Sequence, residues 1–253
     1  MNEDHANYVI NEIKEYYNLL GAGFDKLFLN LSITNKIKYH YLRQSKLNEL
    51  INAVKFEKKG LWSIKPFKNE NDYFVNYYGY GLEKMSLYNI TNDLKMVTRI
   101  ERITFYNHKI NIEGHAYVSR IDSNNKEDIY ISAFLINEGG EVLLPINVDL
   151  KDRKDITHNY GVQKKTGSIL YDYKWSGFEM DLSFSYLLND KMSSGKFYIV
   201  LHFQNGILYR ESMVGLPISN KIYLKKTVKL KDSMVTVSFD ELGNLVLIIN
   251  QEL

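Results

Sequence analysis

Apolar residues recur every three or four positions in the first part of the chain, which is the spacing of an amphipathic helix. Residues 6–20 carry one such stripe, and Gly21 follows where a glycine can end a helix. Residues 24–31 predict a short second helix. Residues 34–58 predict a third, with Thr34 as its N-cap. The first part of the chain is therefore expected to form a small helical unit.

After about residue 70 the period changes from helical spacing to strict alternation, which is typical of half-buried strands. Turn residues separate the alternating runs, as at Asn107-His108 and at Asn205-Gly206. The run 179–188 would place Met180 and Tyr186 on one face. No helical pattern interrupts the strands, so the sequence favours an α+β protein with an antiparallel β-sandwich over a parallel nucleotide-binding sheet. The alternating runs are 102–121, 128–137, 142–150, 179–188, 195–214 and 227–250.

Composition narrows the chemistry. The 253 residues include no cysteine, which excludes a disulfide framework, a thiolate metal site and a cysteine nucleophile. A net charge of +2 gives no reason to expect that the chain as a whole binds nucleic acid. No run approaches the roughly 18 apolar residues of a membrane helix, and the acidic N-terminus does not resemble a signal peptide.

Charge is nevertheless uneven along the chain. Between Thr34 and Lys68 there are nine Lys or Arg residues against two Glu. Such a block can meet phosphates or an anionic lipid surface, and the alternative is an ordinary solvated helix face. The sequence predicts four residues for polyanion binding, Lys36, Lys38, Arg43 and Lys46.

Motifs that mark common enzymes are absent. The sequence has no glycine-rich phosphate loop, no His-Glu-x-x-His, no Gly-x-Ser-x-Gly and no Asp-x-Asp. The histidines are scattered, and His115 and His202 fall in predicted strands, where a satisfied structural role is expected. The carboxylates of 149–155 alternate with Lys and Arg, as in a solvated loop. We therefore predict no catalytic residue, no metal site and no cofactor.

Aromatic clusters are the positive signal. Tyr171, Tyr173 and Trp175 lie together before a predicted strand, and Trp62 stands in a second aromatic stretch. Flat rings can stack on the C–H faces of sugars, so these four residues are candidates for carbohydrate binding. The alternative is a β-sandwich core or a domain interface, where aromatics bury the most area. For Trp175 we expect the core role first and the sugar platform second.

Three stretches carry a family resemblance. They are the strand "INIEGHAY" (110–117), the segment "YKWSGF" (173–178) and the strand that begins at Gly195. Together they resemble the immunoglobulin-like β-sandwich attached to Gram-positive teichoic-acid glycosyltransferases and CDP-glycerol glycerophosphotransferases. The likeness covers residues 100–216. It implies a helical linker-like segment over 1–69 and a β-sandwich region over 70–253, with additional strands in 217–253.

The resemblance implies a non-catalytic accessory region of a cell-wall polymer glycosyltransferase. Such a region would be part of a longer enzyme and would self-associate as a dimer or trimer, bind an anionic glycopolymer, or do both. Its expected location is the cytoplasm, at the inner face of the cell membrane. The alternatives are a stand-alone glycan-active enzyme, with carboxylates that converge from separate strands, and a structural surface module.

Overall fold

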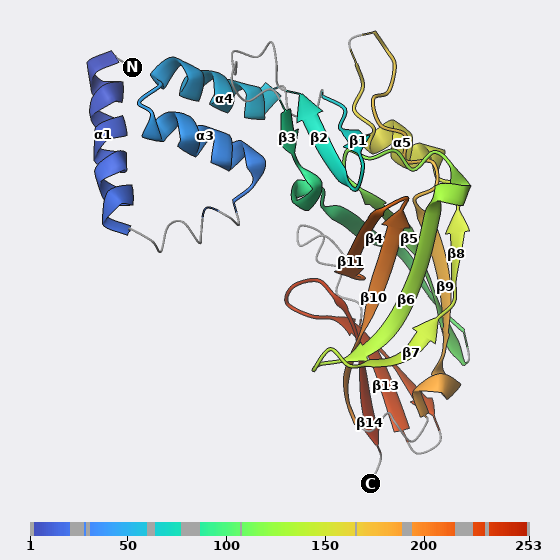
Figure 1. The fold of residues 1–253 in the computed structure, drawn as a ribbon. Coiled ribbons are helices and arrows are strands. Elements are labelled where there is room, and N and C mark those ends of the chain that lie inside the picture. Colours follow the sequence, from blue (N-terminus) through green and yellow to red (C-terminus); the bar gives the residue numbers. More distant parts are fainter. Residues whose placement is uncertain are drawn as a thin grey trace. The chain divides into compact units, whose positions relative to one another are not determined.

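A computed structural model of the chain describes residues 3–20, 28, 31–59, 64–76, 87–106, 108–164, 166–188, 194–215, 225–230 and 233–251. The chain divides into two compact units, Met1–Leu94 and Lys95–Leu253. The first holds helices and a small sheet, and the second holds most of the strands (Figure 1). The described chain is thus a mixture of helix and antiparallel sheet.

Helices α1 (Glu3–Leu20), α3 (Ile33–Arg43) and α4 (Leu47–Lys59) lie in the first unit. Helix α1 confirms the first predicted helix, whereas the second prediction, 24–31, falls almost wholly outside the described residues. The third predicted helix is two helices instead of one. The chain turns between α3 and α4, where Ser45 adopts the left-handed φ of 54°, which no continuous helix can contain.

The small sheet of the first unit consists of β1 (Phe67–Asn69), β2 (Asp72–Asn76) and β3 (Leu87–Asn89) in that order.

Helix α3 is capped by Ser32, not by Thr34, since the Ser32 hydroxyl accepts from the backbone N–H of Asn35. The carboxylate of Asp93 accepts a 2.6 Å hydrogen bond from the N–H of Ile33. This contact joins Asp93, near the end of the first unit, to the start of α3.

The second unit contains two antiparallel sheets. Four strands form one sheet in the order β4-β5-β9-β8, and six strands form the path β12-β13-β14-β10-β6-β7 of the other, with β11 also paired to β10. The strands are β4 (Met96–Phe105), β5 (Lys109–Val118), β6 (Ile129–Asn137), β7 (Val142–Ile146), β8 (Val148–Lys151), β9 (Gly177–Ser183), β10 (Gly195–Asn205), β11 (Leu208–Met213), β12 (Lys225–Leu230), β13 (Ser233–Phe239) and β14 (Leu245–Gln251).

Each sheet buries one face of alternating apolar side chains. Ile110 and Ile112 of β5 are fully buried in the four-stranded sheet, as are Ile199, Leu201 and Phe203 of β10 in the other. The two sheets form layers in which β6 and β10 lie over β5 and β9 (Figure 1). Alternation places the residues named for each strand on one face of that strand.

The predicted hairpins β4–β5, β6–β7, β10–β11 and β13–β14 are confirmed. The turn at Gly206 has a φ of 57°, as a tight hairpin requires. Two predictions about the strands were wrong. The run 142–150 is divided, because β7 pairs in one sheet and β8 in the other. Strand β9 ends at Ser183 and Phe184–Leu188 form a short 3-10 helix, which leaves Tyr186 62% exposed instead of on the buried face.

Helix α5 (Lys154–Tyr160) covers one end of the outer face of the four-stranded sheet. Its first two residues belong to the charged stretch 149–155 that the sequence suggested to be a loop, and residues 149–151 of that stretch belong to β8. Ile156 of α5 joins Tyr117 of β5, Leu170, Tyr171 and Tyr173 in a small second core. This core is what positions the candidate site. Among the described residues, no helix combines the length and the apolar character needed to span a membrane.

Candidate functional site

A β-bulge in β4 directs a glutamate onto a buried histidine. The pairing of β4 with β5 shifts by one residue between Ile100 and Arg102, so Glu101 has no partner across the ladder. A bulge of this kind bends the strand and re-aims a side chain. Glu101 Oε1 accordingly lies 2.8 Å from His115 Nδ1 on β5.

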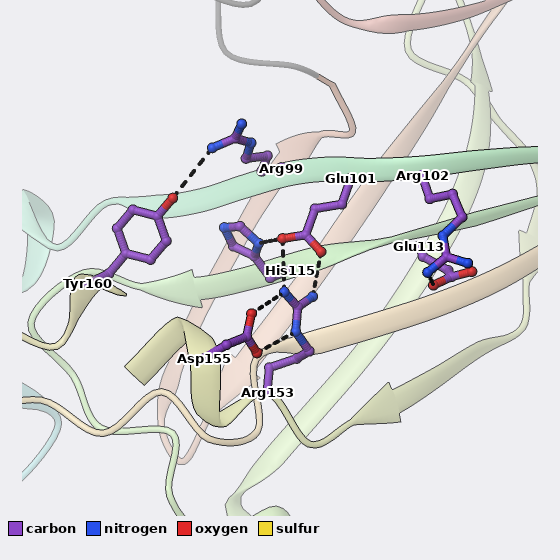
Figure 2. Close-up of polar contacts among 8 residues, drawn as sticks. All are labelled: Arg99, Glu101, Arg102, Glu113, His115, Arg153, Asp155 and Tyr160. Carbon is purple, nitrogen blue, oxygen red and sulfur yellow. Dashed lines mark hydrogen bonds and ion pairs between the residues drawn. The ribbon is translucent and has the colours of Figure 1, made fainter. Parts of the chain in front are cut away.

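Arg153 joins this pair to the start of α5 (Figure 2). Its Nη1 donates to Glu101 Oε2 at 2.6 Å, and its Nη2 donates to Glu101 Oε1 at 3.0 Å. Its Nε and Nη2 also donate to the two oxygens of Asp155, at 2.8 and 2.6 Å. Such forked bonds between a guanidinium and carboxylates are among the stronger polar contacts in proteins. We call Glu101, His115, Arg153 and Asp155 the Glu101 network.

The histidine of the network is nearly inaccessible. Its side chain is 2% exposed, and the rings of Tyr117 and Tyr160 lie 6.0 and 5.8 Å from it. Burial lowers the pKa of His115, and the opposing effect of the hydrogen bond to Glu101 does not restore it. His115 is therefore mostly neutral at pH 7. Because a carboxylate can only accept, the ring proton belongs on Nδ1.

The two carboxylates of the network are held in their ionised form. Partial burial tends to raise the pKa of Glu101, but the hydrogen bonds from Arg153 and His115 outweigh it and the net pKa is lowered. The hydrogen bond from Arg153 lowers the pKa of Asp155. A general acid for glycoside cleavage needs the opposite, a raised pKa. The network therefore acts as a clamp between β4, β5 and α5.

Further ion pairs continue across the outer face of the same sheet. Lys109 and Asp181 are 2.6 Å apart, Lys151 and Glu179 are 2.7 Å apart, and Arg102 and Glu113 are 3.2 Å apart. Exposed pairs of this kind contribute on the order of 0–1 kcal/mol each. Figure 2 shows the Arg102–Glu113 pair beside the network. This part of the face is an ordinary solvated sheet surface.

Two of the predicted carbohydrate-binding residues are buried in the second unit. Tyr171 is 0% and Tyr173 is 2% exposed, and the ring of Tyr173 stacks 4.1 Å from that of Tyr117. The Tyr173 hydroxyl accepts a 2.9 Å hydrogen bond from the buried backbone N–H of Arg120. These two rings are core residues whose faces are closed to a sugar. Trp62 lies outside the described residues.

Trp175 was expected to be a buried core anchor. Its side chain is only partly buried, so it is not a core residue of the kind expected. Its backbone N–H donates to the carbonyl of Ser123 at 2.7 Å. The ammonium groups of Lys126 and Lys174 lie 5.2 and 5.3 Å from the centroid of its ring. Both distances are within the range of a cation–π contact. We call Trp175, Lys126 and Lys174 the Trp175 platform.

The four predicted polyanion-binding residues all lie on or beside α3 in the first unit. Lys38 is engaged with Glu57 of α4 at 2.8 Å, and the guanidinium of Arg43 lies 5.9 Å from the ring of Tyr39. Lys36 and Lys46 are partly exposed, and no carboxylate pairs with either among the described residues. The polyanion contact stays a prediction for these residues.

No other feature of the described residues points to a catalytic or metal-binding site. Among the described residues, no three His, Asp or Glu side chains gather as metal ligands would. A surface pocket beside the β6–β7 turn is lined by Asn137, Glu138 and Lys196, among others, and it includes neither the Glu101 network nor the Trp175 platform.

Two parts of the candidate site were missed by reasoning from the sequence. Glu101 was not singled out, because it precedes the alternating run 102–121, although the spacing of three residues between Ile100 and Ile103 marks the extra residue. Lys126 lies far from Trp175 in the sequence, and only folding brings the two together. The one available signal was the basic neighbour Lys174, which directly precedes Trp175.

Comparisons with known proteins give structural matches, and these are distant. No protein-family model matches the chain, and no curated protein sequence does. Among solved structures, the crystal structure of S. aureus TarS, a teichoic acid glycosyltransferase, matches 99% of this chain and 40% of that chain, at 12% identity and a TM-score of 0.44.

A crystal structure of residues 217–571 of S. aureus TarS matches at 11% identity and a TM-score of 0.44, with 99% of this chain and 63% of that chain covered. The chain thus spans less than two thirds of either neighbour. Because a TM-score below 0.5 leaves even a shared fold open, these matches assign no function to the chain.

Proposed function

We propose that this chain is a non-catalytic region of a cell-wall glycopolymer glycosyltransferase and that it binds an anionic polymer of sugars or polyols and phosphate. The observation that carries the proposal is the Trp175 platform, in which one partly exposed indole is flanked by two lysines. An indole face suits the C–H face of a sugar or polyol, and an ammonium group suits the neighbouring phosphate.

The charges around Trp175 support an anionic ligand. Lys126 forms no ion pair among the described residues, so its cation–π contact is the interaction that a phosphate would replace or supplement. Lys174 lies 3.6 Å from Asp152, and both side chains are more than one third exposed. An exposed pair at this distance is weak, so a phosphate can compete with Asp152 for Lys174.

A non-catalytic role is supported by the state of the carboxylates. Glu101 of strand β4 and Asp155 of helix α5 are two carboxylates that meet from separate elements. Both bind Arg153, and their lowered pKa values suit them to accept hydrogen bonds, not to donate a proton to a leaving group. We therefore favour binding over glycan cleavage.

The immunoglobulin-like architecture belongs to the same proposal. What supports it is a pair of antiparallel sheets with buried inner faces and short hairpins in the second unit. In the first unit, the partly exposed Lys36 and Lys46 would supply further contacts to polymer phosphates. Self-association as a dimer or trimer stays a prediction, and light scattering after size exclusion would test it.

The test is a binding titration of the full chain with poly(glycerol phosphate). We expect binding that weakens as salt is raised, because exposed charges are screened. The double substitution Lys126→Ala and Lys174→Ala should remove most of the binding. Lys164→Ala, at an exposed lysine of the same unit, is the matched control and should bind as the unsubstituted chain does. Equal affinities for all three proteins would refute the proposal.

A further inference from the structure

The outer face of the seven-stranded sheet carries two exposed tyrosines in one row. The register places Tyr130 of β6 opposite Gln204 of β10, and Gln204 opposite Tyr209 of β11. Residues in one such row point to the same side of the sheet. The two tyrosines therefore flank Gln204 on one face, two strand spacings or about 10 Å apart.

Both rings are open to solvent although they lie on a sheet. Tyr130 is 64% and Tyr209 is 48% exposed. The ring of His202, in the next row, lies 5.3 Å from that of Tyr209 and 4.8 Å from that of Phe134. The three rings extend an aromatic surface over β6, β10 and β11, which are adjacent strands (Figure 1).

Hydrogen-bonding groups alternate with these rings. The amide nitrogen of Gln204 donates to the carbonyl of Gly206 at 2.9 Å, so its side-chain oxygen stays available to accept. The second row consists of Ser132, His202 and Glu211. The carboxylate of Glu211 is 64% exposed and lies 3.5 Å from His202 Nε2. The face thus offers donors and acceptors between flat apolar surfaces.

We infer that this face binds an uncharged saccharide chain, with Tyr130 and Tyr209 as stacking platforms and Gln204 as the hydrogen-bonding residue between them. Sugar rings present C–H faces to aromatic rings and hydroxyl groups to amides and carboxylates. The two rows contain no lysine or arginine, and they contain the acidic Glu211. That charge pattern suits an uncharged sugar and disfavours a phosphate.

The same features argue against a protein partner on this face. Interface cores are depleted of charged residues, whereas an exposed glutamate stands in the second of these rows. The inference deepens the proposed function, because it assigns to the sheet the sugar part of a polymer whose phosphates bind elsewhere. It rests on that proposal only for the identity of the natural ligand, since the geometry of the row stands without it.

The experiment is saturation-transfer NMR and affinity measurement on the full chain with chitotetraose, an uncharged oligosaccharide of N-acetylglucosamine. We expect measurable binding by the unsubstituted chain. Tyr130→Ala and Tyr209→Ala should each weaken it about tenfold, because one stacked ring is lost in each variant. Tyr186→Ala is the matched control, since Tyr186 is 62% exposed in the same unit but lies outside this face.

Three results would overturn the inference. They are the absence of binding to chitotetraose, binding that the two tyrosine substitutions leave unchanged, and a lower solution mass for either variant, which would make the face a contact between copies of this chain. The poly(glycerol phosphate) titration separates the two proposals. A chain that retains phosphate-polymer binding but ignores chitotetraose would refute this inference alone, and the reverse pattern would refute the proposed function alone.

Discussion

Gly177 and Arg153 are packed so closely that any side chain at the glycine would force its neighbours to move. A Cβ placed on Gly177 would lie 2.5 Å from Cγ of Arg153 and 2.9 Å from the backbone oxygen of Lys151. The stem of Arg153 therefore crosses directly over the start of β9 on its way to Glu101 and Asp155. The glycine of the segment "WSGF" is required by this crossing.

Replacing Gly177 with alanine should push Arg153 away from the network. We expect a loss of about 1–3 kcal/mol in the free energy of unfolding, as for other overpacked sites. Chemical denaturation would measure it. Gly195→Ala is the matched control, since a Cβ on that strand glycine would meet nothing closer than 3.7 Å. Equal stability of the two variants would show that Arg153 is not held in this position.

Acidification should destabilise the second unit in two steps. The folded pKa of His115 is lowered, so the unfolded chain binds the proton first and stability falls as the pH drops through and below about 6.5. The lowered pKa values of Glu101 and Asp155 add a second loss below about pH 4.5. Denaturation at a series of pH values would measure both steps.

His115→Gln separates these steps. Glutamine keeps a donor for Glu101 but does not titrate, so the variant should lose the upper step and retain the lower one. If the variant and the unsubstituted chain show the same dependence on pH between 7 and 5.5, titration of His115 is not linked to folding.

Removing one oxygen from Tyr173 should cost more than its size suggests. Tyr173→Phe leaves the buried backbone N–H of Arg120 without its acceptor, and Arg120 is held at a φ of 71°. An unsatisfied buried donor costs about 1–3 kcal/mol. Thermal or chemical unfolding would detect the loss. Tyr186→Phe, at an exposed tyrosine, should change nothing and serves as the control.

Trp175 should tolerate substitution better than its buried neighbours. A fully buried large aromatic typically costs about 3–5 kcal/mol when truncated to alanine, and we expect that cost for Tyr173→Ala. Trp175→Ala should cost less, because the indole is partly exposed and the lysines beside it are also solvated. A larger loss of unfolding free energy for Trp175→Ala than for Tyr173→Ala would restore its role as a core anchor.

Alternation in the sequence was sufficient to locate most strands and hairpins, because it reports directly which residues face a core. It could not reveal that the extra residue Glu101, marked by the spacing of three between Ile100 and Ile103, turns its side chain toward His115. Nor could it place Trp175 at the surface and Tyr173 in the core, since both are large aromatics of one short segment. Tyr173 belongs to the buried cluster that includes Ile156 of α5 and Tyr117 of β5, and Trp175 does not.

The candidate binding surfaces were harder to predict from the sequence than the strands, because folding brings their residues together from distant positions. The row of Tyr130, Gln204 and Tyr209 depends on the register of three strands, and two of its members lie more than seventy positions from the third. Tyrosines are frequent in this chain, so no single one attracts notice before the pairing is known.

The short connection between β7 and β8 links the layers mechanically. Ile146 pairs with β6 in one sheet, and Val148 pairs with β9 in the other, so a single residue separates the two attachments. Pulling the sheets apart would have to strip one of these strands from its neighbour. A tensile load applied across the second unit should therefore break it in one event instead of peeling its layers one after the other.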